Sequence, residues 1–159
     1  MKEKFNPFNL AIFVLVCEVA GLIGSIFTIS AIGTWYKDLN KPDFSPPDWI
    51  FGPVWTILYA LMGISAYLVF SRGWKNKKVR NAINTFGIQL TLNVLWSIIF
   101  FGGKNPFLAL LEITILWAAI FVTIQKFNGI SKTAGKLMVP YLIWVTFATT
   151  LNLSIVLMN

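Results

Sequence analysis

The sequence predicts an all-α integral membrane protein, a bundle of five transmembrane helices in a single domain over residues 1–159. Of its residues, 57% are hydrophobic and only 12% are charged, with a mean hydropathy of +0.71. A water-soluble domain of this size is less apolar. A membrane span needs about 20 predominantly apolar residues. Five stretches reach that length, at about 8–32, 49–71, 82–101, 106–125 and 134–158. These runs are long and continuous, which favours helices over the short, alternating strands of a barrel.

The first span, 8–32, carries an acid near its middle. Its apolar run is about twice as long as the core of a secretory signal, so we predict an uncleaved helix. No Lys or Arg lies near the middle of any span to pair with Glu18, and an acid at this depth is costly. We interpret it either as a contact between helices or as a ligand-facing or proton-carrying acid. Four small residues would let a neighbouring helix approach closely: Gly21, Gly24, Ser25 and Thr28.

The connection 33–48 is the one long loop, and proline stiffens it. Proline fixes its own φ and restricts the preceding residue, so this loop is predicted to be extended or turned. We interpret it as a lid, whose principal residues are Trp35, Tyr36, Pro42, Pro46 and Pro47. The alternative is that Trp35, Tyr36 and Trp49 form an aromatic belt at the membrane interface. Asp48 is expected to cap the second span through its carboxylate, or Ser45 to begin the turn.

Each later span repeats aromatic or polar side chains at steps of three or four residues, which places them on one helix face. The four sets are Phe51, Trp55, Tyr59 and Met62; Gln89, Asn93, Trp96 and Phe100; Leu108, Glu112, Ile115 and Ala119; and Pro140, Trp144, Ala148 and Asn152. Amides and acids are not expected to face lipid. If these faces converge, they enclose a pocket suited to a large, flat, mostly apolar ligand. The alternative is that the aromatic residues only fill a membrane core.

The net charge of +7 follows the topology rather than a nucleic-acid-binding surface, so no nucleic acid partner is expected. Ten of the thirteen basic residues fall at the N-terminus, in the second connection and in the fourth connection. Positive residues favour the cytoplasmic side. We therefore expect a bacterial or archaeal cell membrane protein with the N-terminus in the cytoplasm, the C-terminus outside and the lid facing out.

The residue types present exclude several kinds of site. The sequence has no histidine, which removes the commonest metal ligand, the usual general base and the usual axial ligand of haem. It also lacks a phosphate-binding GxxxxGK[ST] loop and paired-cysteine zinc spacing. We therefore expect no metal, and no cofactor.

Several motifs, in order along almost the whole chain, resemble the translocator protein family, also called tryptophan-rich sensory proteins (TspO) or peripheral benzodiazepine receptors. They are Trp35-Tyr36, Lys41-Pro42, Pro46-Pro47 and Trp49; Gly52-Pro53-Val54-Trp55, Leu58-Tyr59 and Met62-Gly63; Gln89-Leu90, Leu92-Asn93, Trp96 and Phe100-Phe101-Gly102; and Pro140-Tyr141-Leu142, Trp144, Phe147-Ala148-Thr149 and Leu151-Asn152. The resemblance implies a homodimer of five-helix bundles. It also implies a pocket beneath the first loop that binds porphyrins, sterols and isoquinoline-type compounds.

Carried over by position, the resemblance places eight residues at this pocket: Trp55, Tyr59, Asn93, Trp96, Trp144, Ala148, Leu151 and Asn152. The chain departs from animal members in two places. Leu108 stands where they have a pocket tryptophan, and the segment after Asn152 lacks the tyrosine and arginine of their sterol-recognition segment. Sterol is therefore a less well supported partner than a tetrapyrrole.

Three functions are compatible with these residues. The first is a receptor or translocator that binds porphyrin, not as His-ligated haem, between the second, third and fifth spans. In it Trp55 and Trp144 flank the ring, and Asn93 and Asn152 orient its polar edges. The second is a light- and oxygen-dependent porphyrin-degrading enzyme that acts at the same two tryptophans. The third is a small ion-coupled transporter that uses Glu18 and Glu112.

Overall fold

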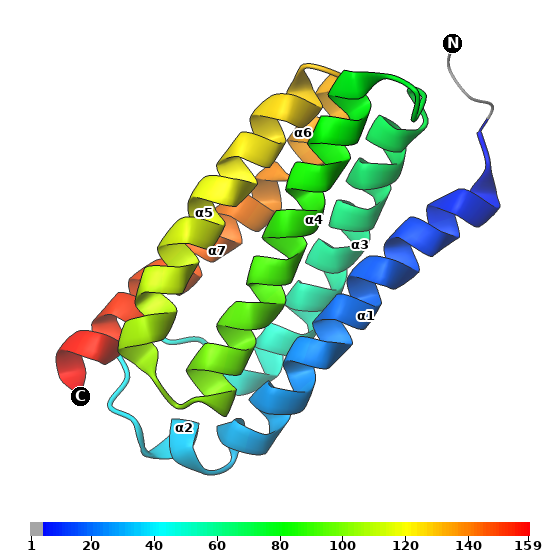
Figure 1. Ribbon diagram of the computed structural model, residues 1–159. Helices are drawn as coiled ribbons and strands as arrows, with labels where there is room; N and C mark the ends of the chain where they lie inside the picture. Colours follow the sequence, from blue (N-terminus) through cyan, green and yellow to red (C-terminus); the bar gives the residue numbers. More distant parts are fainter. Residues whose placement is uncertain (1–4) are drawn as a thin grey trace.

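Five long helices form a bundle in the computed structural model, which describes residues 5–159 (Figure 1). All regular structure in this range is helical. In chain order the elements are α1 (Pro7–Ile32), α2 (Trp35–Asp38), η1 (Asp48–Ile50), α3 (Phe51–Phe70), α4 (Lys77–Ser97), η2 (Ile98–Gly102), α5 (Pro106–Asn128), α6 (Lys132–Leu137) and α7 (Val139–Met158). Five helical segments have the length and apolar composition of membrane spans. The prediction of an all-α, five-span membrane protein is thus confirmed.

Asn-Pro pairs begin two of the helices. The Asn6 side chain accepts hydrogen bonds from the backbone of Phe8 and Asn9, and Pro7 occupies the first turn of α1. Asn105 and Pro106 do the same for α5, through the backbone N–H of Leu108 at 2.9 Å. The first amides of a helix have no partner inside it, so an asparagine cap followed by proline is a stable start.

The other predicted boundaries need correction. The second span begins with the 3₁₀ turn η1, and no side chain caps it, so the expected Asp48 cap is wrong. The third span begins at Lys77 rather than 82, because Asn76 caps it through the Lys78 N–H and the helix extends beyond the apolar run. The same span ends in the π-helix η2. The fifth is divided into α6 and α7 at Met138.

The two ends of the bundle differ in composition. One end holds the connections 71–76 and 129–131, with the basic residues Arg72, Lys75, Lys77, Lys78, Arg80, Lys126, Lys132 and Lys136 near them. We call this the basic end. The opposite end holds α2, the α4–α5 connection and the C-terminus (Figure 1), and we call it the lid end. Which end faces the cytoplasm stays a prediction from the charges.

Helix α1 changes partner along its length. Toward the basic end it packs against α3, where a Cβ atom on Gly63 would lie 2.5 Å from the Cα atom of Val14. The backbone N–H of Asn6 also donates to the Tyr67 hydroxyl at 2.7 Å. Toward the lid end α1 lies against α4 and η2, with Gly24 next to Ser97. The lid-end halves of α1 and α3 therefore separate, and space remains between them.

Candidate ligand cavity

A cavity of about 400 Å³ occupies this space beneath the lid. Its wall comes from α1, η1, α3, the end of α4 with η2, and α7, with Tyr36 of α2 also contributing. The side chains that line it are largely apolar and aromatic, and many helices contribute to it. This volume lies within the range of about 300–1,000 Å³ that is usual for small-molecule sites.

Seven of the eight residues that the sequence placed at the pocket lie in the cavity wall. They are Trp55, Tyr59, Trp96, Trp144, Ala148, Leu151 and Asn152. The eighth, Asn93, does not line the cavity and is only 3% exposed. The structure therefore brings seven of the residues to one space. That they bind a ligand there stays a prediction.

Asn93 lies behind Tyr59 in a buried chain of hydrogen bonds. The Tyr59 hydroxyl donates to the Asn93 side-chain oxygen, and the Asn93 amide donates to the Tyr141 hydroxyl at 2.9 Å. All three side chains are buried. Buried polar groups need partners, and these three satisfy one another across α3, α4 and α7. Asn93 thus holds the Tyr59 ring at the wall, instead of facing a ligand as expected.

Asn152 plays a similar part for Trp96. The Trp96 Nε1 donates to the Asn152 side-chain oxygen at 3.3 Å, and the Asn152 amide donates to the Pro106 carbonyl at 2.9 Å. The Trp96 ring stacks on Phe100 at a centroid distance of 5.0 Å. Although Asn152 lines the cavity, its polar atoms already bond to protein. That Asn152 orients a ligand's polar edge stays a prediction.

Two further aromatic clusters complete the wall. Trp55 stacks on Tyr59 at 5.5 Å and meets the Tyr141 ring edge-on at 6.1 Å. Trp144 meets Phe51 edge-on at 6.1 Å, and its Nε1 is buried without a hydrogen-bond partner among residues 5–159. Rings held on several sides in this way present fixed flat faces to the cavity.

The first helix is a wall that sequence reasoning indicated only through the ligand-facing alternative for Glu18. It contributes Glu18, Gly21, Leu22, Gly24, Ser25, Thr28, Ile29 and Ile32. A side chain at Gly21 would overlap the Tyr59 ring. The small-residue seam of α1 was the available signal, but it was interpreted only as a site of helix packing. The expected location between the second, third and fifth spans must therefore be extended to the first.

The lid is fastened to the bundle by its aromatic residues. Tyr36 is 3% exposed and packs edge-on against Phe100 and Phe101 at 6.2 and 5.6 Å. The aromatic-belt alternative therefore does not apply to Tyr36. Burial raises the pKa of its phenol, which remains neutral. Trp35 meets Phe100 edge-on at 5.7 Å.

Polar contacts hold the remainder of the lid. The Lys41 ammonium donates to the Tyr36 carbonyl at 2.9 Å and lies 4.4 Å from the centroid of its ring. Asn40 and Asn159 bond to each other at 3.0 Å, so the C-terminus clamps the lid. Four of the five named lid residues lie outside the cavity wall: Trp35, Pro42, Pro46 and Pro47.

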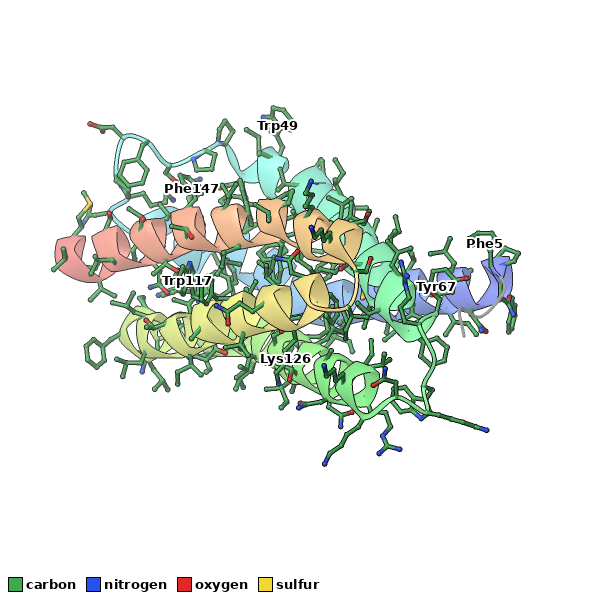
Figure 2. All side chains as sticks on the ribbon, turned by 90° about the horizontal axis from the view of Figure 1, so that it is seen from above. Phe5, Trp49, Tyr67, Trp117, Lys126 and Phe147 are labelled. Carbon is green, nitrogen blue, oxygen red and sulfur yellow. The ribbon has the colours of Figure 1, made fainter. Side chains whose placement is uncertain are left out.

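Trp49 differs from Tyr36 in its exposure. It lies at the cavity margin, but 73% of it is exposed, and it projects away from the bundle (Figure 2). This position agrees with the aromatic-belt alternative for Trp49.

The two intramembrane acids have different positions. Glu18 lines the cavity, whereas Glu112 of α5 is 6% exposed and lies outside the wall. Neither carboxylate oxygen of Glu112 has a partner among the described residues. Gln89 is also buried away from the cavity, and its amide lies 3.9 Å from the Met62 sulfur. Among residues 5–159, no group of three His, Cys, Asp or Glu side chains could hold a metal ion.

Comparison with known proteins gives one consistent match. The model of the TspO/MBR family matches residues 13–158. The chain is 43% identical to the "Tryptophan-rich protein TspO" of Chlorobaculum tepidum over 95% of this chain and 96% of that protein. It is likewise 43% identical to the protein of the same name from Archaeoglobus fulgidus, over 97% and 99%. The human "Translocator protein" is 36% identical over 88% of this chain and 83% of its own length.

Proposed function

The chain belongs to the TspO/MBR family, and on that premise we propose that it is a membrane receptor or translocator for porphyrin-type tetrapyrroles and other planar apolar ligands. The observation that carries the proposal is the convergence of Trp55, Trp96 and Trp144 from three helices on one cavity. A large aromatic ring bound there would lie against several fixed flat faces at once. Stacking of this kind supplies affinity with little dependence on polar contacts.

The residues take different parts in this proposal. Trp55 and Trp144 flank the ligand ring, while Ala148 leaves room between Trp144 and Asn152 on the same face of α7. Asn93 and Asn152 position Tyr59 and Trp96 through their hydrogen bonds. The porphyrin binds as a ligand without an axial histidine, since the sequence has none. A cytoplasmic N-terminus and a homodimer remain predictions alongside this function.

A titration of purified protein with protoporphyrin tests the site. The measurement follows porphyrin absorbance in the dark, because the variants lose tryptophan fluorescence. We expect Trp55→Ala with Trp144→Ala to bind at least about tenfold more weakly, since each aromatic contact contributes about 0.5–1.5 kcal/mol beyond its buried area. Trp74→Ala is the matched control, because Trp74 lies at the basic end, 43% exposed, outside the cavity. Unchanged affinity in the double variant would refute the site.

A second candidate function uses two of these indoles, those of Trp55 and Trp144. Light- and oxygen-dependent breakdown of a bound porphyrin is favoured by their position, because tryptophan is oxidisable and dioxygen serves as the oxidant. Illumination of the complex in air, with porphyrin absorbance followed over time, separates the two functions. Loss no faster than in detergent alone, or no slower with Trp→Phe variants, supports binding only.

A further inference from the structure

The cavity wall is unbalanced in charge. Among residues 5–159, the only charged side chains that line it are two acids, Glu18 on α1 and Asp48 in η1. The lid cation Lys41 does not line the cavity and is already engaged by the carbonyl and the ring of Tyr36. A charged ligand inside the cavity therefore meets two acids and no lining Lys or Arg among the described residues.

Glu18 is the acid placed to contact a ligand within the membrane. It lies one turn from Gly21 and Leu22, which also line the cavity, and on the same helix stripe as Ser25 and Ile29. No hydrogen bond to its carboxyl group comes from any described residue. An acid at this depth is costly unless something pairs with it. The missing partner can come from the ligand.

The neighbouring hydroxyl groups do not supply that partner. The Ser25 hydroxyl donates to the Leu22 carbonyl at 2.7 Å, and the Thr28 hydroxyl donates to the Gly24 carbonyl at 3.2 Å. Tyr59, the closest phenol across the cavity, donates to Asn93. These donors are used inside the protein, and Glu18 is left as an open acceptor.

We propose that Glu18 determines the ligand class of this cavity. It favours planar apolar ligands with a basic nitrogen or another strong hydrogen-bond donor on the edge that faces α1, and it disfavours ligands with a carboxylate there. The inference rests on the proposed function, because it assumes that a planar ligand occupies the cavity. An ammonium group forms a charge-assisted hydrogen bond with the carboxylate, whereas a carboxylate of the ligand is repelled.

Three porphyrins that differ only at their periphery test this inference. They are protoporphyrin with two carboxylates, its neutral dimethyl ester, and a diamide that carries two ammonium groups. The dissociation constant of each is measured at neutral pH by porphyrin absorbance, for the native chain and for Glu18→Gln. The ratio between the two proteins for one porphyrin cancels the partition of that porphyrin into detergent.

We expect the native chain, relative to Glu18→Gln, to bind the diammonium porphyrin about tenfold more tightly, which corresponds to about 1.4 kcal/mol. We expect the same ratio to be near one for the ester and below one for the diacid. Glu112→Gln is the matched control, because it makes the same change outside the cavity, and it should leave all three constants unchanged. Asp48→Asn separates the contribution of the acid at the cavity margin.

The outcomes distinguish this inference from the proposed function. If none of the three porphyrins binds the native chain, the proposed function fails. If all three bind and Glu18→Gln changes their affinities by the same factor, the proposed function stands and the role of Glu18 is refuted. An equal effect of Glu112→Gln would also refute it.

Discussion

The two halves of the α1–α3 pair use glycine for opposite purposes. Near the basic end, Gly63 lies against the backbone of Val14, and the two helices are sealed together. Near the lid end, Gly21 lies against the Tyr59 side chain, and the helices enclose a cavity. The difference is what lies across the glycine. Backbone against backbone leaves no space, whereas a ring held in place by Asn93 keeps the helices apart.

Two tyrosines of α3 show the same contrast between the basic end and the lid end. At the basic end Tyr67 bonds to the backbone of Asn6 and meets Phe5 edge-on at 6.0 Å (Figure 2), and this contact fixes the start of α1. At the lid end Tyr59 bonds to a side chain and presents its ring to the cavity. One tyrosine thus closes the helix pair, and the other shapes a space that can be filled. Substitutions at the two ends should therefore be separable into effects on stability and on binding.

The largest expected effect is a loss of stability at the basic end, where the backbones of α1 and α3 are in contact. In Gly63→Ala the new methyl group would lie 2.5 Å from the Val14 Cα atom and 2.8 Å from the Phe13 carbonyl oxygen, so backbone must move. Overpacking of this kind costs about 1–3 kcal/mol, and the upper part of that range is expected here. Thermal unfolding in detergent, followed by circular dichroism, measures it.

Gly52→Ala is the matched control for that substitution, because nothing lies within 4 Å of the position that its Cβ would take. Its midpoint of unfolding should stay near that of the native chain. Equal midpoints for the Gly63 and Gly52 variants would contradict the close contact between α1 and α3.

The next largest effects are expected when the hydroxyl group of Tyr59 or of Tyr67 is removed. Tyr59→Phe leaves the Asn93 oxygen buried without its donor, which costs about 1–2 kcal/mol of stability, and it frees the ring at the cavity wall. We expect weaker binding of porphyrin by about threefold as well as a lower unfolding midpoint. Tyr67→Phe should lower only the midpoint, because Tyr67 lies outside the cavity. A loss of affinity in both variants would show that the two ends are coupled.

Much of the fold follows from local sequence signals. Asn-Pro pairs mark the starts of α1 and α5, and the five apolar runs locate the spans. The π-helix η2 and the break at Met138 were not predicted. The break at Met138 does have a local signal, because Pro140 at the start of α7 cannot donate to the carbonyl four residues before it. An apolar run alone gives no signal for η2.

The candidate site was also predictable only in part. Helical spacing identified the faces that carry Trp55 and Trp144, but spacing does not tell which face meets a cavity and which meets another helix. Asn93 and Glu112 therefore turned out to be buried behind the wall. Apart from Glu18, the wall from α1 was missed for the same reason, since a small-residue seam has the same pattern whether it meets backbone or empty space.

The smallest effect concerns how firmly the lid closes the cavity. In Pro46→Gly with Pro47→Gly, the lid keeps its aromatic anchor at Tyr36 but loses the stiffness that positions the chain before η1. Each change lowers the stability by about 0.4–1 kcal/mol, which corresponds to a fall of a few degrees in the unfolding midpoint. We expect porphyrin to dissociate about threefold faster. Stopped-flow displacement measures the rate. Asn159→Ala removes two of the three hydrogen bonds between Asn40 and the end of α7, and leaves the one to the Met158 carbonyl and the prolines in place. It should accelerate dissociation in the same direction. Rates equal to that of the native chain in both variants would show that the loop only connects two helices, and closure of the cavity would then depend on the helices themselves.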